Sequence, residues 1–101
     1  MSQNHEIRVI AHVQAQPGAE AAIKAALITL VRATRAEPGC IGYTLHEDPA
    51  KAGHFYFYEI YRDQAALDHH MQSPHLAAAF AAVGHLVAAE PVITPIKEVA
   101  I

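Results

Sequence analysis

The stretch FYFYEIYRD at residues 55–63 decides the fold of this 101-residue chain, because five of the chain's seven aromatic side chains lie in it. Such a run predicts a β-strand, in which odd-numbered side chains share one face and even-numbered side chains share the other. Aromatic residues occupy both faces, and Glu59 stands among them. Because an unpaired carboxylate is costly to bury, we expect Glu59 to have a partner from another part of the chain.

Three segments precede this strand. Apolar residues alternate in the first and the third, as in strands, and recur at helical spacing in the second. The short turn over residues 49–53 makes an antiparallel hairpin of the two strands that flank it. The predicted elements in this part of the chain are a strand over 6–14, a helix over 19–37 ended by Pro38-Gly39, a strand over 40–48 in which Ile41, Tyr43 and Leu45 share a face, and a strand over 54–62.

Two helix-start signals follow the strand over 54–62. Asp63 is a typical N-cap, and Ser73 before Pro74 is a second one, so we expect a helix that is broken near residue 73. Its second part carries an apolar stripe and ends at Pro91, and a last strand over 92–101 is interrupted by Pro95. The stripe consists of Leu76, Phe80, Val83 and Val87.

The order strand, helix, strand, strand, helix, strand predicts a single α+β domain over residues 1–101. This is the ferredoxin-like split βαβ arrangement (β-α-β-β-α-β), an antiparallel four-stranded sheet with helices on one face. The strand over 54–62 is apolar on both faces, so the second face also needs a cover. We expect a homodimer whose sheets pack face to face, with a monomer that exposes a tyrosine-rich face as the alternative.

Composition excludes several classes of protein. The net charge is −3 and the Lys and Arg residues form no basic stripe, which argues against nucleic acid as a partner. No apolar run approaches the length of a membrane span, and the first ten residues lack the pattern of a signal peptide. The single cysteine, Cys40, rules out an internal disulfide. These features predict a soluble, cytoplasmic protein.

Three segments resemble the antibiotic biosynthesis monooxygenase domain family. They are EPGCIGYTLHED at 37–48, FYFYEIYRDQAALDHHMQSPH at 55–75 and LAAAF at 76–80, and the likeness extends over about residues 6–98. The resemblance implies a dimeric α+β barrel. It also implies one of several activities: cofactor-free oxidation of hydroquinones or polycyclic phenols, isomerisation of a phosphorylated signal molecule, or haem degradation. The haem-degrading members use a Trp and an Asn, whereas this chain lacks Trp and has only Asn4, which argues against that activity.

His70, His75 and Glu59 are the candidate catalytic residues. His70 should share a helix face with Ala66 and Leu67 and point toward the sheet, while His75 lies at a helix start. Imidazole titrates near neutral pH and suits a general base, and Glu59 paired to either histidine would fix its tautomer. Alternatively, Glu59 forms an ion pair with Arg8, Arg62 or a residue of the partner subunit, and the histidines are structural.

Aromatic residues are the candidate substrate-binding groups. Tyrosine hydroxyls can hold a phenolic substrate or a developing oxyanion, and apolar rings can line its cavity. The alternative is a purely structural role, in which these rings fill the core and an interface. The candidates are Tyr43, Tyr56, Tyr58, Phe57 and Phe80.

We expect no metal and no bound cofactor. Nucleotide-binding glycine motifs are absent from the sequence. His69, His70 and His75 with Glu59 or His12 could supply a mixed metal site, but they lack the spacing of an H-E-x-x-H motif. The sequence therefore predicts a cofactor-free oxygenase acting on a small hydroquinone or phenol with O₂. The alternatives are an isomerase that moves a proton next to a carbonyl and a non-catalytic dimeric barrel that binds a metabolite.

Overall fold

The computed structural model describes residues 5–101, so that Asn4 lies outside the described range. Its elements form a four-stranded antiparallel sheet with strand order β2-β3-β1-β4. The predicted ferredoxin-like α+β fold is thus confirmed. The elements are β1 (Ile7–Gln14), α1 (Glu20–Thr34), β2 (Cys40–Glu47), β3 (His54–Tyr61), α2 (Gln64–Met71), α3 (Pro74–Val83), a 3₁₀ turn (Gly84–Leu86) and β4 (Val92–Ile96).

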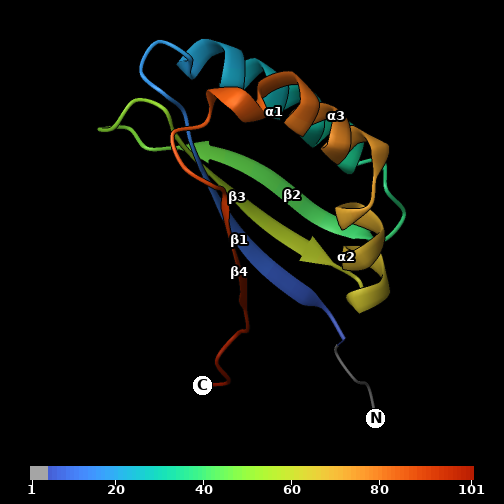
Figure 1. Ribbon diagram of the computed structural model, residues 1–101. Helices are drawn as coiled ribbons and strands as arrows, with labels where there is room; N and C mark the ends of the chain where they lie inside the picture. The colour runs from blue at the N-terminus through green and yellow to red at the C-terminus, as the bar shows by residue number, and fades with distance from the viewer. Residues whose placement is uncertain (1–4) are drawn as a thin grey trace.

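The helices lie on one side of the sheet. In Figure 1, α1 and α3 run side by side over the strands, and α2 lies near the end of β3. The core forms between these two layers, where Ile23, Leu27 and Leu30 of α1 pack with the inward side chains of β1 and β3. Among the described residues, no helix is both long and apolar enough to cross a membrane.

The faces of β3 follow the alternation in its sequence. Phe55, Phe57, Glu59 and Tyr61 are buried, while Tyr56 on the other face is 36% exposed. Pairing with β1 on one side and β2 on the other makes β3 an interior strand of the sheet. The segment that carries Glu59 is therefore held rigidly beneath the helices.

Both predicted caps are present. The Asp63 carboxylate accepts a hydrogen bond from the Ala66 amide at 2.9 Å, and the Ser73 hydroxyl accepts one from the Leu76 amide at 3.3 Å. Each cap satisfies an amide that has no partner within its own helix. The break that Ser73 and Pro74 introduce separates α2 from α3, so that the chain changes direction between His70 and His75.

Several predicted boundaries were wrong. The first helix ends at Thr34 rather than near residue 37, because amides 36 and 37 bond three residues back in tighter turns. The last helix ends at Val83 rather than at Pro91: a 3₁₀ turn starts at Gly84, and Val87 is extended and bridges to Ala15.

The ends of two strands also differ from the prediction. β4 stops at Ile96 instead of continuing to residue 101. In β2, the register shifts between Cys40 and Gly42, which turns Ile41 outward to 54% exposure while Tyr43 stays buried. A bulge of this kind breaks the two-residue alternation on which the prediction rested.

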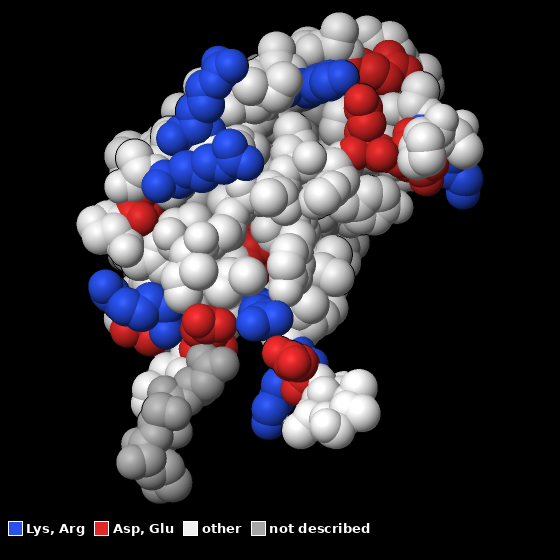
Figure 2. Space-filling model, turned by 180° about the vertical axis from the view of Figure 1, so that it is seen from behind, with Lys and Arg blue, Asp and Glu red and all other residues white. Residues whose placement is uncertain are grey.

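Charged side chains are unevenly spread over the surface. Seen from behind in Figure 2, Lys, Arg, Asp and Glu gather toward the upper and lower parts of the molecule, and the middle of this face is largely free of them. This distribution agrees with the low charged fraction of 17%.

Candidate active site

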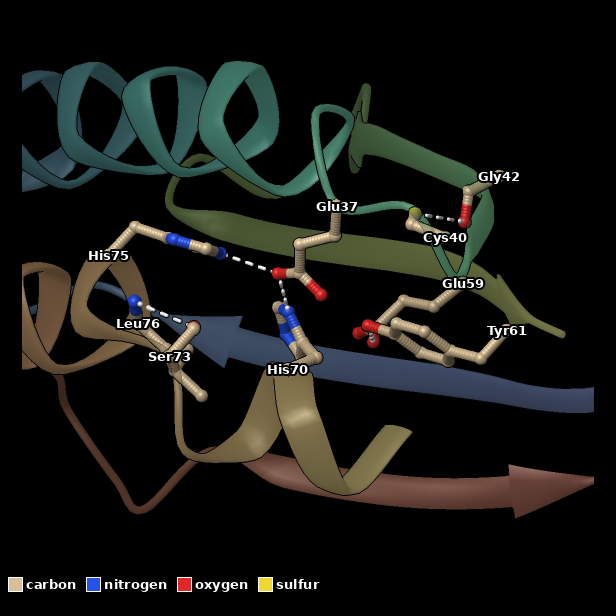
Figure 3. Close-up of polar contacts among 9 residues, drawn as sticks. All are labelled: Glu37, Cys40, Gly42, Glu59, Tyr61, His70, Ser73, His75 and Leu76. Carbon is tan, nitrogen blue, oxygen red and sulfur yellow. Dashed lines mark hydrogen bonds and ion pairs between the residues drawn. The ribbon is translucent and has the colours of Figure 1, made fainter. Parts of the chain in front are cut away.

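One carboxylate joins the two candidate histidines, and it is Glu37. Its Oε2 atom lies 2.9 Å from Nδ1 of His70 and 2.5 Å from Nε2 of His75. Figure 3 shows the Glu37 side chain between the two imidazole rings, which come from α2 and α3. Glu37 is 8% exposed and His70 is 2% exposed, so this contact is made out of water.

Local backbone contacts bring these three residues together. The tight turns after α1 place Glu37 inward, and the next turn is fixed by a 2.8 Å hydrogen bond from the Arg62 amide to the Gly39 carbonyl. Gly39 approaches α2 so closely that a Cβ atom there would lie 2.4 Å from the Cβ of Ala66. The glycine therefore lets the turn that carries Glu37 pack directly against the helix that carries His70.

The hydrogen bonds define what His70 can do chemically. An ionised carboxylate only accepts hydrogen bonds, so Nδ1 of His70 donates its proton to Glu37. The other ring nitrogen, Nε2, then carries the lone pair. A histidine held in this way by a buried carboxylate is a competent general base, since the carboxylate fixes the tautomer and stabilises the imidazolium once it forms.

His70 lines an apolar cavity between the sheet and the helices. Only Tyr43, Glu59 and His70 bring polar side chains to its wall, and the wall contains no Lys or Arg among the described residues. The other lining residues include Leu27 and Leu30 from α1, Phe57 from β3, Ala79 and Phe80 from α3, and Ile93 from β4. A cavity of this kind suits a neutral, largely apolar ligand with a few polar substituents.

Glu59 pairs with neither the histidines nor the arginines that we considered as its partners. The Tyr61 hydroxyl donates a 2.6 Å hydrogen bond to Oε1 of Glu59, and no hydrogen bond or ion pair joins Glu59 to a described His or Arg. The pairing of Glu59 with His70 or His75 was therefore wrong, and so was its ion pair with Arg8 or Arg62. Burial raises the pKa of the Glu59 carboxyl, although the Tyr61 hydrogen bond and nearby His70 act to lower it.

We predict that Glu59→Gln stabilises the protein more at neutral than at acidic pH. The raised pKa means that the folded state binds this proton more tightly than the unfolded state does. The contribution of the carboxyl to stability is then complete below its unfolded pKa and is lost as the pH rises through its folded pKa. Glutamine remains neutral and can still accept the Tyr61 hydrogen bond.

Urea unfolding of Glu59→Gln and the wild type across mildly acidic to neutral pH measures this difference. The free energy of unfolding of the variant should rise relative to the wild type as the pH increases. The exposed Glu90→Gln change is the matched control. A difference for Glu59→Gln that does not vary with pH would contradict the prediction.

The candidate substrate-binding residues divide between the two faces of the sheet. Tyr43, Phe57 and Phe80 line the cavity, with Phe80 half exposed at 50%. Tyr56 and Tyr58 lie on the opposite face, where Tyr56 stacks on His12 and Tyr58 accepts a 3.2 Å hydrogen bond from Arg8. These two tyrosines are therefore placed away from the cavity of their own chain.

The Tyr43 hydroxyl is suited to donating a hydrogen bond. Burial and the nearby Glu59 carboxylate raise the pKa of Tyr43, so its phenol remains protonated. Its ring centroid is 5.3 Å from that of His70. A substrate oxygen that loses its proton to His70 could therefore accept a hydrogen bond from Tyr43.

The sequence prediction did not include Glu37 among the site residues. One physical signal was present: Glu37 follows the C-terminal end of a helix, where the helix dipole disfavours a carboxylate. A carboxylate at that end that is also buried needs nearby donors, and the two histidines supply them. Figure 3 shows Glu59 and Tyr61 as a separate pair beside this group.

The fold agrees with the comparisons to known proteins. The sequence model of the family described as "Antibiotic biosynthesis monooxygenase" matches residues 6–82, and the chain therefore belongs to this family. The match includes the turn with Glu37, the strand with Glu59, and both histidines.

Two relatives show how closely the chain follows the family. The protein named "Putative monooxygenase Rv0793" from Mycobacterium tuberculosis is 39% identical over 95 residues, which cover 91% of this chain and 93% of the relative. The match to its solved structure covers 94% of this chain and 96% of the chain in that structure, with a TM-score of 0.86 at 36% identity. The crystal structure of PA3566 from Pseudomonas aeruginosa has a TM-score of 0.90 at 31% identity and covers 99% of this chain and 100% of its own.

Proposed function

We propose that this protein is a cofactor-independent monooxygenase that oxidises a hydroquinone or a polycyclic phenol with O₂. The observation that carries this proposal is the buried Glu37–His70 pair at the wall of an apolar cavity. Membership of a monooxygenase family supports the class of reaction. His70 is the general base in this proposal, Glu37 positions it, and Tyr43 donates a hydrogen bond to the substrate oxygen.

The reaction begins when Nε2 of His70 takes the proton of a substrate hydroxyl. The resulting anion passes one electron to O₂, and the two radicals combine at a ring carbon. The O–O bond then breaks as the ring carbon loses its proton: one oxygen atom stays on the ring as a carbonyl, which in a hydroquinone product enolises to a hydroxyl group. The other oxygen leaves as water with that proton and the proton that His70 returns. The substrate itself supplies all four electrons, so a hydroquinone and O₂ give a hydroxyquinone and H₂O without an added reductant.

The cavity wall favours this substrate class over a phosphorylated one. A phosphate group needs Lys, Arg or a cluster of amides, and none of the described wall residues is Lys or Arg. Arg8 and Arg62, the cations that we considered for such a group, form their ion pairs with Glu6, Glu98 and Asp63 outside the cavity. An isomerase of a phosphorylated metabolite is therefore less well supported.

Oxygen uptake by metal-stripped protein with a panel of hydroquinones tests the proposal. We expect uptake above the autoxidation rate and transfer of one ¹⁸O atom from ¹⁸O₂ to the product. Turnover that continues equally in anaerobic buffer would show an isomerase instead. Binding of panel members without turnover would show a metabolite-binding protein, and either result would overturn the proposed reaction.

We further propose that two copies pack their sheets face to face. The outer face of the sheet exposes apolar side chains from β1 and β4, and no described element covers it. Ile10 from β1 is 40% exposed, and Val92 and Ile96 from β4 are 56% and 38% exposed. A second copy is the cover that our sequence analysis anticipated, and the expected α+β barrel of the family agrees with it.

An Ile10→Glu substitution should separate such a dimer. Ile10 lies on the outer face, paired in register with Tyr58 on one side and Thr94 on the other. In the dimer, each copy would bury one new carboxylate against apolar side chains, which is costly. Light scattering after size exclusion should change from the mass of two chains to the mass of one. Ala21→Glu, at an exposed position of α1 in the helical layer, should leave the mass unchanged. A wild-type protein that has the mass of one chain would contradict the proposal.

A further inference from the structure

We propose that Glu37, His70 and His75 form a binding site for a divalent transition metal of the zinc type. One ligand atom from each residue lies within 4.8 Å of the other two. Two imidazole nitrogens and one carboxylate oxygen are a donor set that zinc and its neighbours bind, with water completing the coordination.

The present hydrogen bonds do not prevent coordination by the same atoms. Nδ1 of His70 and Nε2 of His75 each hold a proton that can move, through solvent, to the other nitrogen of the same ring. Each ring then turns a lone pair toward the oxygen of Glu37 that it now contacts. Because this shift moves a proton within each ring rather than off it, an ion can replace the two hydrogen bonds without a net loss of protons.

Burial and charge favour a cation at this position. The side chains of Glu37 and His70 are 5% and 3% exposed, and the described side chains that contact the Glu37 carboxylate are those of the two histidines. A buried carboxylate without a Lys or Arg partner gains from a nearby cation. The side chain of His75 is 23% exposed and offers a route from solvent to the site.

The three ligands come from three separate segments, which is why no spacing motif marks them in the sequence. Glu37 follows α1, His70 lies in α2 and His75 lies in the first turn of α3. The motif H-E-x-x-H places its ligands on one helix, whereas this group depends on the helix break at Ser73 and Pro74.

Metal binding and the base function of His70 exclude each other. A metal at Nδ1 requires the proton of His70 to reside on Nε2, the nitrogen that takes the substrate proton in the proposed reaction. The metal-loaded protein should therefore lack oxygen uptake, and this consequence rests on the proposed function. The binding itself does not.

A titration of metal-free protein with Co²⁺ tests the site through the visible ligand-field absorption of the bound ion. We expect one Co²⁺ per chain, displaced by Zn²⁺. Glu37→Gln and His75→Ala should each weaken binding by at least about tenfold, since loss of a ligand exceeds the effect of losing its supporting contacts. Circular dichroism confirms that each variant is folded, and His75→Gln serves as a second variant where His75→Ala is not.

Two histidine variants outside the group provide controls. His69 is exposed and adjacent to His70, so His69→Ala should bind Co²⁺ as the wild type does. His12 and His54 form a separate pair on the outer face, with 3.0 Å between their ring nitrogens, so His54→Ala should also bind normally. Loss of binding in His54→Ala, or unchanged binding in both Glu37→Gln and His75→Ala, would overturn the proposal, as would the absence of Co²⁺ absorption.

The results for metal binding and for catalysis can be separated. Co²⁺ binding is measured without substrate, and oxygen uptake is measured on metal-free protein. Binding without uptake would retain the metal site and reject the oxygenase. Oxygen uptake without Co²⁺ binding would retain the oxygenase and reject the metal site.

Discussion

The His70→Ala variant is expected to lose oxygen uptake by about 10²- to 10⁴-fold, the usual contribution of a positioned general base. Nε2 of His70 is the ring nitrogen left free by the hydrogen bond to Glu37, and His70 lines the cavity. Without this base, no imidazole among the described residues of the cavity wall remains to remove the substrate proton. Steady-state oxygen consumption with the best hydroquinone of the panel measures the effect.

A neighbouring histidine provides the control for this experiment. His69→Ala removes an exposed imidazole one residue away and should retain wild-type uptake. Both variants should bind the hydroquinone, as judged by ligand-induced thermal stabilisation. Uptake by His70→Ala that equals the wild-type rate would retain the reaction but reject His70 as its base.

The Glu37→Ala variant is expected to lower the free energy of unfolding by about 2–4 kcal/mol, because it leaves buried imidazole donors without an acceptor. Glu37 accepts hydrogen bonds from both histidines, and the side chain of His70 is only 3% exposed. Urea unfolding at neutral pH measures the loss. Glu37→Gln keeps one acceptor oxygen and should lose less.

The matched control for Glu37 is another glutamate in an exposed position. Glu90→Ala should change the free energy of unfolding by no more than about 0.5 kcal/mol, as is usual at exposed sites. If Glu37→Ala unfolds at the same urea concentration as the wild type, the contact between Glu37 and the histidines contributes nothing to the fold, and its positioning role is contradicted.

Much of the fold could be predicted from the sequence because its signals are local. The alternation in β3 correctly placed Phe57, Glu59 and Tyr61 on one face of the strand, and the Asp63 and Ser73 caps marked the two helix starts. Each of these features depends on residues within one element. They required no knowledge of how elements pack.

The partners of the site residues could not be predicted, since they depend on packing between segments. Alternation showed that Glu59 points inward but not which side chain it meets there, and Tyr61, two residues along the same strand, is its partner. Glu37 lies in a turn, where no periodicity indicates direction. Its contact with His70 spans 33 positions and depends on Gly39 approaching Ala66.

Two further errors came from patterns that continue past a break in structure. The apolar spacing of α3 extends through Val87, but the helix gives way at Gly84 to a 3₁₀ turn. The alternation in β2 includes Ile41, but a bulge turns this residue outward. Apolar spacing alone does not record an inserted residue or a change of helix type.

The tautomer of His70 in the metal-free protein tests the central claim most directly, because base function requires a lone pair on Nε2. Nitrogen-15 NMR of the histidine rings, with His70 assigned by the His70→Ala spectrum, distinguishes a protonated from an unprotonated ring nitrogen. We predict a proton on Nδ1, donated to Glu37, and an unprotonated Nε2 that changes its chemical shift when a hydroquinone binds. A neutral His70 with its proton on Nε2, or an Nε2 signal that hydroquinone binding leaves unchanged, would contradict the proposed base.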